Sequence, residues 1–134
     1  MTVIQFEGVT VLADDVAGTA GFYEHALGFE VVVRETDYVA FDTGTGVRLA
    51  VFRRSGMGAH THDHPSFRQP RSGQAVELNF RCATPQEVRE RFAGLVARGA
   101  VVVAEPADRD WGQIAGFFAD PEGNVHSLFA DLPA

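Results

Sequence analysis

Three histidines recur at alternate positions in one short stretch of the chain, Ala-His-Thr-His-Asp-His-Pro. If this stretch is extended, His60, His62 and His64 point to one side, an arrangement that a divalent metal ion can use. Gly56 and Pro65 flank the histidines and favour a solvated surface loop instead. Metal binding by the three side chains therefore stays open, and the polar loop is the favoured interpretation.

The chain holds one cysteine, Cys82, so it can form neither an internal disulfide nor a cysteine-based metal site. Cys82 lies in an apolar run with strand character, which favours a small core residue over a reactive thiol. No set of nucleophile, base and orienting group stands out elsewhere. The sequence therefore gives no indication of covalent catalysis.

Composition narrows the class of protein further. The chain has 134 residues, 46% of them hydrophobic, which suits one soluble domain with a substantial core. Its net charge of −7 argues against nucleic acid, whose phosphates require basic patches. No apolar run approaches the ~20 residues that cross a bilayer. The N-terminus lacks the basic start and apolar core of a signal peptide, so we expect a cytoplasmic protein without membrane partners.

The elements that must position these side chains follow one order in the first half of the chain. The patterns predict a strand over 3–12, a helix over 14–27, and strands over 29–34, 38–42 and 47–53. Asp14 and Asp15 supply N-cap chemistry for the helix, and Gly28 ends it. Phe22, Tyr23 and other apolar residues form its buried stripe.

The second half repeats this order. We expect a strand over 74–82, a helix over 84–98, and strands over 100–104, 112–119 and 124–130. Thr84 caps the helix, Pro85 takes its first position, and Glu87 completes a capping box. The apolar stripe of this helix consists of Val88, Phe92, Leu95 and Val96.

Between the halves lies a stretch rich in glycine, proline and histidine that shows no hydrophobic period. We interpret it as a connecting loop over 55–73, which separates module one, about 1–54, from module two, about 74–134. The repeated order predicts an α+β fold. Its two βαβββ modules form a half-open barrel around a cavity, within a single domain over 1–134.

Two motifs in register resemble the glyoxalase/bleomycin-resistance/dioxygenase superfamily, also called the vicinal-oxygen-chelate superfamily. The first is Phe22-Tyr23-Glu24-His25-Ala26-Leu27-Gly28-Phe29 at the end of the first helix. The second is Trp111-Gly112 followed by Phe117-Phe118-Ala119-Asp120-Pro121-Glu122-Gly123-Asn124. With the matching element order, the resemblance spans nearly the whole chain, and it is nearest in type to metal-free bleomycin-resistance-like members.

The resemblance also implies where a metal ion would be bound in metal-bearing relatives. Those positions fall on Gly8, on Leu49 or Ala50, on Glu77 and on Ser127. Of these residues only Glu77 is a good ligand for a hard or borderline metal. We therefore expect no metal and no other cofactor at the usual place.

Several side chains on or near the implied cavity are candidates for ligand binding. Trp111 is the only tryptophan, and at the cavity rim it could stack on a planar or cationic ligand, or plug the edge of the core. Glu77 could pair with a ligand amine, act as a base, or form a salt bridge with Arg48. The candidate ligand-binding residues are Trp111, Glu77, Phe41, Phe52, Arg48 and Ser127.

Other conspicuous residues receive structural interpretations. His126 alternates with Ser127 and is expected to face the helix layer. Asp120 is expected to accept backbone hydrogen bonds inside its turn, while Gly28 and Gly123 are expected to adopt positive φ.

The function hypothesis that follows is a small-molecule binder with a metal-free cleft, for a drug or metabolite that is cationic or aromatic. Binding of a drug in this way would be one route to antibiotic resistance. The alternative is an enzyme of the same superfamily, a lyase, isomerase or dioxygenase, with a noncanonical metal site or Glu77 as base. A scaffold without turnover is a third hypothesis. The resemblance further implies a homodimer, and covering open sheet edges would favour it.

Overall fold

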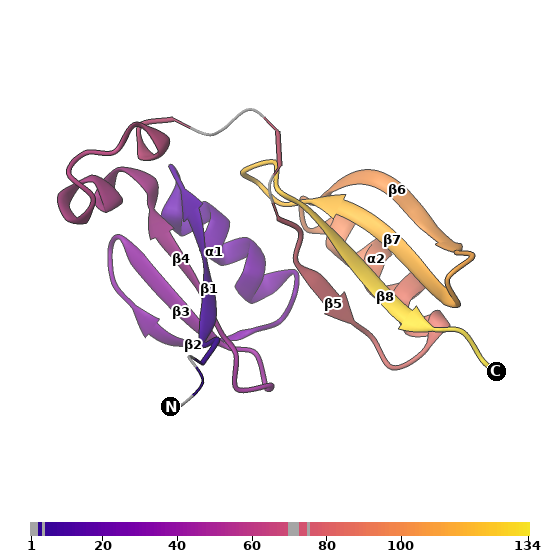
Figure 1. Cartoon of the computed structure of the whole chain (residues 1–134). Helices are drawn as coiled ribbons and strands as arrows, with labels where there is room; N and C mark the ends of the chain where they lie inside the picture. Colours follow the sequence, from indigo (N-terminus) through magenta and orange to yellow (C-terminus); the bar gives the residue numbers. More distant parts are fainter. Residues whose placement is uncertain (1–2, 4, 70–72, 75) are drawn as a thin grey trace. The chain divides into compact units, whose positions relative to one another are not determined.

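The computed structural model describes residues 3, 5–69, 73, 74 and 76–134. Parts of three expected elements, at residues 4, 70–72 and 75, lie outside the described residues. The chain divides into two compact units, Met1–Arg71 and Ser72–Ala134. Each unit contains a strand, a helix and three further strands in this order (Figure 1).

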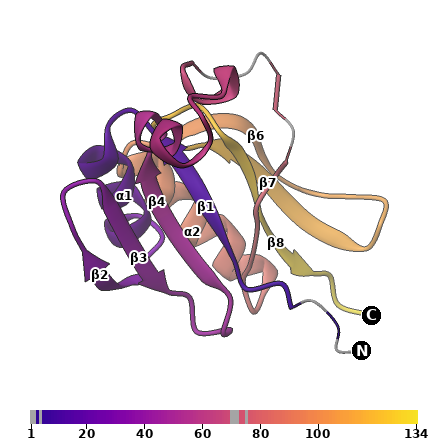
Figure 2. The same cartoon turned by 60° about the vertical axis from the view of Figure 1, so that its left-hand side comes forward.

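Module one forms a four-stranded sheet with the order β1-β4-β3-β2. Strand β1 runs parallel to β4, whereas β3 is antiparallel to both of its neighbours. Helix α1 lies on one face of this sheet (Figure 2). The elements are β1 Gly8–Ala13, α1 Val16–His25, β2 Glu30–Arg34, β3 Tyr38–Asp42 and β4 Arg48–Arg53.

Module two repeats this topology with the strand order β5-β8-β7-β6, and α2 packs on one face of its sheet. Its elements are β5 Asn79–Arg81, α2 Pro85–Ala97, β6 Val101–Asp108, β7 Gln113–Ala119 and β8 Val125–Asp131. The α+β class and the two βαβββ modules are confirmed. Neither four-stranded sheet closes on itself into a barrel.

Each helix is held to its sheet by aromatic residues. In module one Tyr23 of α1 is fully buried, and its ring lies 6.3 Å from that of Phe41 in β3. In module two Phe92 of α2 lies 6.5 Å from Phe118 of β7. The expected stripes are buried with two exceptions: Ala26 is half-buried, and Val96 is 38% exposed.

The helix ends follow the expected capping chemistry. Asp15 accepts a hydrogen bond from the Gly18 N–H at 3.0 Å, and Thr84 accepts one from the Glu87 N–H at 3.1 Å. The Glu87 carboxylate reaches back to the N–H of Ala83 at 3.3 Å, one residue before the cap. Satisfying these N–H groups fixes where each chain segment turns from strand to helix.

The segment after β4 differs from the expected irregular loop. It contains two short 3₁₀ helices, η1 Arg54–His60 and η2 Pro65–Phe67. His62 and Asp63 between them have positive φ values of 53° and 52°, so the chain reverses there. Across the described residues, no helix is both long enough and apolar enough to span a membrane.

Candidate functional site

The sheet of module two has a pocket on the face opposite α2. Phe118 faces α2, so strand alternation places Phe117 on the other face, where Ser127 is its direct neighbour across the ladder. The pocket there has a volume of about 370 Å³. It is lined by Glu77, Asn79, Arg81, Trp111, Gln113, Ala115, Phe117, Ser127 and Phe129.

Three of the candidate ligand-binding residues meet in this pocket: Glu77, Trp111 and Ser127. Asn79 and Ser127 are direct partners in the parallel pairing of β5 with β8. Their side chains are joined by a hydrogen bond of 2.8 Å between the Ser127 hydroxyl and Asn79 Oδ1. This pair forms the polar floor of the pocket, and the aromatic residues beside it are Phe117 and Phe129.

A chain of hydrogen bonds fixes the orientation of the tryptophan. Trp111 is 58% exposed, and its indole N–H donates to Gln113 Oε1 at 3.0 Å. Gln113 in turn donates to Asp131 at 3.0 Å, and Arg81 donates to the other Asp131 oxygen at 3.0 Å. The hydrogen bond from Gln113, together with Arg81, lowers the pKa of the Asp131 carboxyl below its ordinary value.

The two charged residues that line the pocket are in different situations. Arg81 is paired with Asp131, and its guanidinium lies 4.7 Å from the ring centre of Phe129. Glu77 is exposed and makes no ion pair or hydrogen bond with the described residues. A ligand entering the pocket therefore meets one carboxylate whose charge is not matched within the described part of the protein.

Side chains, rather than a long backbone ladder, attach the Glu77 segment to β8. Gln74 makes two hydrogen bonds of 2.6 Å to the N–H and C=O of Val125. His126 Nδ1 accepts the Leu78 N–H at 3.2 Å, immediately after Glu77 in the chain. These two attachments explain why β5 spans only Asn79–Arg81 instead of the expected 74–82.

The expected structural roles of His126 and Asp120 are confirmed. His126 is buried between the rings of Phe80 and Phe118, with Nε2 3.5 Å from the Asp120 carboxylate. Asp120 also accepts hydrogen bonds within its turn, including the Asn124 N–H at 2.9 Å. Gly28 and Gly123 have the expected positive φ, at 81° and 84°. Cys82 is also buried, and burial raises the pKa of its thiol.

Module one has a pocket of a different kind on the face of its sheet opposite α1. Its volume is about 360 Å³, and it is lined by Thr10, Leu12, Tyr38, Phe52 and Met57. Phe52 packs edge-on against Tyr38 at 6.2 Å, while Met57 comes from η1. None of the five lining residues carries a charge.

Two other candidate residues of module one lie elsewhere. Phe41 is buried against α1 and is a core residue, so the expectation of a pocket wall is corrected. The reason is register: Phe41 pairs with Leu49, which points to the face opposite that of Phe52. Arg48 is exposed at the start of β4, and its acidic neighbour within module one is Glu7 at 3.5 Å.

The positions where metal-bearing relatives would bind an ion do not fit one here. Gly8 and Ala50 offer no donor side chain, and Ser127 is hydrogen-bonded to Asn79. The described residues contain no group of three or more histidine, cysteine or acidic side chains close enough to hold a metal ion. His60, His62 and His64 do not share an extended segment, because the chain is helical and then reversed there.

The residues that the sequence interpretation missed all lie on alternate positions beside those it found. Asn79 and Arg81 follow Glu77 at intervals of two, and Phe129 follows Ser127 in the same way. Extending the alternation along each strand would have identified them. Asp131 continues the same series and completes the hydrogen-bonded chain to Trp111.

Solved structures share this fold along nearly the whole chain. A glyoxalase/bleomycin resistance protein/dioxygenase from Nocardioides is 25% identical, with a TM-score of 0.81, covering 100% of this chain and 87% of its own. A family enzyme of that description from Burkholderia phytofirmans PsJN is 21% identical, with a TM-score of 0.86, covering 96% of this chain and 100% of its own. A lactoylglutathione lyase from Agrobacterium tumefaciens is 22% identical, with a TM-score of 0.70, covering 94% and 92%.

Among curated proteins, no sequence matches this chain. The family comparison is decisive, because one sequence profile matches residues 5–128, which extend from before β1 into β8, the last strand of module two. The chain belongs to the glyoxalase/bleomycin resistance protein/dioxygenase superfamily.

Proposed function

We propose that this protein binds a planar organic cation in the module-two pocket, without a metal ion. The single observation that carries the proposal is the carboxylate of Glu77, which has no oppositely charged partner among the described residues, in a pocket whose other charge, Arg81, is paired with Asp131. A cation entering the pocket would supply the missing opposite charge.

The aromatic residues support the planar part of the proposal. Trp111 combines a large ring, 58% exposure and an indole N–H held by Gln113, so little conformational freedom is lost when a ligand stacks on it. A cation over an indole face gains a further attraction from the ring quadrupole. The Asn79–Ser127 pair offers hydrogen bonds at the floor.

The test compares N-methylquinolinium with neutral quinoline at pH 8, with quenching of Trp111 fluorescence as the readout. Because Glu77 is exposed, Glu77→Gln should weaken binding of the cation by about 1–2 kcal/mol, roughly five- to thirtyfold. The affinity for quinoline should be unchanged. Trp111→Ala removes the aromatic anchor and should weaken binding of both compounds by about 2 kcal/mol. Because this variant lacks the fluorescent residue, its affinities are measured by calorimetry.

Glu30→Gln is the matched control, since it removes one exposed carboxylate from module one and should alter neither affinity. Equal losses for the cation and for quinoline in Glu77→Gln would contradict the charge-recognition proposal. If the protein chemically converts a bound compound and Glu77→Gln abolishes that conversion, the alternative hypothesis, an enzyme that uses Glu77 as base, would replace the binder hypothesis.

A further inference from the structure

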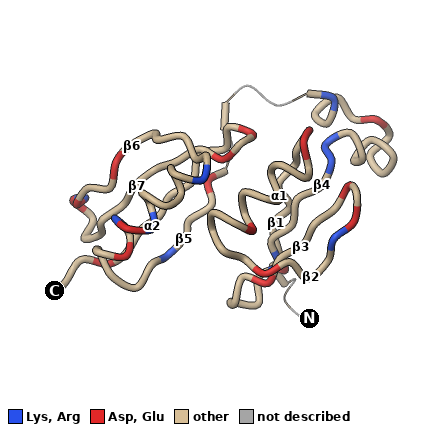
Figure 3. Tube along the Cα trace, turned by 180° about the vertical axis from the view of Figure 1, so that it is seen from behind, with Lys and Arg blue, Asp and Glu red and all other residues tan. Residues whose placement is uncertain are grey.

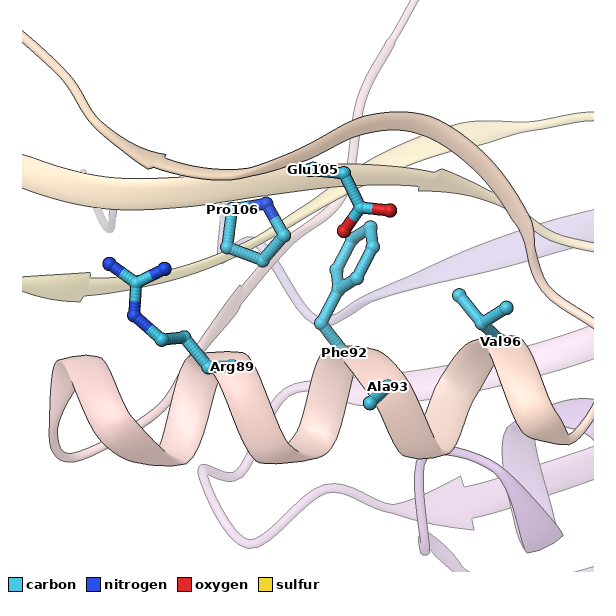
Figure 4. Close-up of a pocket in the computed structure, with 6 residues that line it drawn as sticks. All are labelled: Arg89, Phe92, Ala93, Val96, Glu105 and Pro106. Atoms are coloured by element: carbon cyan, nitrogen blue, oxygen red, sulfur yellow. The ribbon is translucent and has the colours of Figure 1, made fainter.

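A groove lies between α2 and β6, on the face of the module-two sheet that α2 covers (Figure 4). Its volume is about 540 Å³, which is within the range of roughly 300–1,000 Å³ that small-molecule sites occupy. The pocket that contains Glu77 lies on the other face of the sheet, and the two share no lining residue among those described. The α2–β6 groove is lined by Arg89, Phe92, Ala93, Val96, Glu105 and Pro106.

A β-bulge gives the groove its carboxylate. The register of β6 against β7 shifts between Ala104 and Ala107, so that Glu105 and Pro106 both stand opposite Gly116. Neighbouring residues of a regular strand point to opposite faces of a sheet, whereas Glu105 and Pro106 both line the groove. Bulges re-aim side chains in this way, often beside a functional site. A regular β6 would turn either Glu105 or Pro106 away from α2.

Hydrogen bonds to the backbone hold the bulge in place. The Arg109 guanidinium donates to the C=O of Glu105 at 3.3 Å and to the C=O of Ala115 at 2.9 Å. Pro106 has no N–H to donate, and bulges and edge strands are the positions in a sheet that tolerate this loss. The Glu105 side chain takes no part in these contacts, so its carboxylate stays available to a ligand.

The floor of the groove is apolar. Gly116 of β7 lies beneath it, where a Cβ would meet the Phe92 ring at 2.8 Å and Pro106 Cγ at 3.0 Å. Because glycine has no side chain, Phe92 and Pro106 both rest directly on β7. Phe92 is only 2% exposed, while Val96 at one end of the groove is 38% exposed. A hydrocarbon ligand would therefore meet a close-packed apolar surface.

Two opposite charges border this apolar floor. Figure 4 shows the Arg89 guanidinium and the Glu105 carboxylate on either side of Pro106. They form no ion pair with each other or with any other residue in the described part of the chain. No charged residue precedes Glu105 in β6, and this first part of the strand is tan in Figure 3. The groove therefore offers one charge of each sign to a ligand.

We propose that the α2–β6 groove binds an ω-amino acid, a small molecule in which a hydrocarbon chain separates an ammonium group from a carboxylate. The ligand carboxylate pairs with Arg89, the ammonium group pairs with Glu105, and the hydrocarbon chain lies over Pro106 between them. A ligand with one charge leaves either Arg89 or Glu105 without a partner. An α-amino acid carries both charges on one carbon atom, whereas the two side chains lie on opposite sides of Pro106 and beyond ion-pair distance of each other.

An NMR titration tests the ligand class, with the methyl signals of Val96 and the Nε–H signal of Arg89 as readouts. Straight-chain ω-amino acids from 4-aminobutanoate to 8-aminooctanoate are added separately, and at least one should bind with a dissociation constant on the order of 1 mM. Norleucine is an isomer of 6-aminohexanoate with both charges on one carbon atom. It should bind roughly threefold or more weakly than the best ω-amino acid, as should hexanoate and hexylamine.

Charge reversal tests the two ion pairs. Arg89→Glu places two carboxylates in the groove and Glu105→Arg places two guanidinium groups there, so each should weaken binding of the best ω-amino acid roughly fivefold or more. Arg89→Glu should then prefer 1,6-diaminohexane, and Glu105→Arg should prefer hexanedioate. The double variant again has one charge of each sign, and its affinity should return to within roughly threefold of the parent with the ligand reversed. Arg98→Glu, outside the groove, is the matched control for Arg89→Glu and should leave the affinity unchanged.

Circular dichroism confirms that each variant is folded, and if one single variant unfolds, the other decides. The proposal would be overturned if no ω-amino acid shifted these signals, if norleucine bound as tightly as the best ω-amino acid, or if the folded single variants kept the preference of the parent. Binding of Nα-acetyl-lysine without binding of any free ω-amino acid would overturn it too, because the groove would then recognise the C-terminal lysine of another protein. Because the groove and the Glu77 pocket share no lining residue among those described, this proposal and the proposed cation site can fail separately.

Discussion

The two modules have the same topology but different chemistry on the sheet face that each helix leaves free. In module one the pocket is uncharged and is built around Phe52 and Tyr38. In module two it combines Glu77, Arg81 and a hydrogen-bonded floor with aromatic residues. The helix-facing sides are alike, with an aromatic pair at the centre of each. The fold therefore constrains one face of each sheet and leaves the other free for ligand recognition.

The largest effect should come from substitutions on the helix-facing side of each sheet, where the two modules are alike. Phe41→Ala and Phe118→Ala each remove a buried ring and should lower the free energy of unfolding by about 3–5 kcal/mol, measured by urea denaturation. Phe52→Ala, on the opposite face and only partly buried, should cost clearly less. If Phe41→Ala cost no more than Phe52→Ala, the distinction between the two faces would fail.

A smaller effect is expected from replacing His126, a polar residue on the buried, helix-facing side of the module-two sheet. Leu49 of β4 and His126 of β8 are both buried, but only His126 accepts a backbone hydrogen bond, from Leu78. His126→Leu would leave that N–H without its acceptor and should cost about 1–3 kcal/mol. Hydrogen exchange should quicken at the Leu78 amide but not at Ile114 in β7. An unchanged Leu78 rate would show that this hydrogen bond does not hold the Glu77 segment.

The smallest effect concerns ionisation at the rim of the module-two pocket. Gln113→Ala removes the main cause of the lowered pKa of Asp131, so this pKa should rise towards the ordinary value of about 3.9 in an NMR titration. Because the folded-state pKa is the lower one, Asp131 stabilises the fold above about pH 4, and this contribution is lost as pH falls through the folded-state value. A titration identical in parent and variant would contradict the assignment.

Most of the fold could be predicted because hydrophobic period and helix caps are local properties of the sequence. Asp15, Thr84 and the terminating glycines mark both helices to within a few residues. The short β5 was not predictable in this way, since it depends on side-chain hydrogen bonds from Gln74 and His126 across 51 and 48 positions of sequence.

The candidate site was predictable only in part, for a reason of register. Alternation shows which residues share a face within one strand, but not which face of the neighbouring strand joins them. Ser127 and Trp111 were therefore found from motifs, whereas Phe41 was placed in the pocket although its pairing with Leu49 puts it in the core. Alternation alone would have placed Arg81 on the face of Glu77 and Asp131 on the face of Ser127, but it does not show that these two side chains pair with each other, 50 positions apart in the sequence.

The parallel pairing of the first and last strands of each module has a consequence for how the chain folds. In module one, β2, β3 and β4 are joined by short antiparallel connections, while β1 must find β4 across the helix and two other strands, with Gly8 beside Arg48. Nearby contacts form sooner than distant ones because closing a longer loop costs more entropy. We therefore expect the three-stranded meander to form early and the first strand to dock last. During synthesis, module one can complete these steps before the strands of module two have left the ribosome.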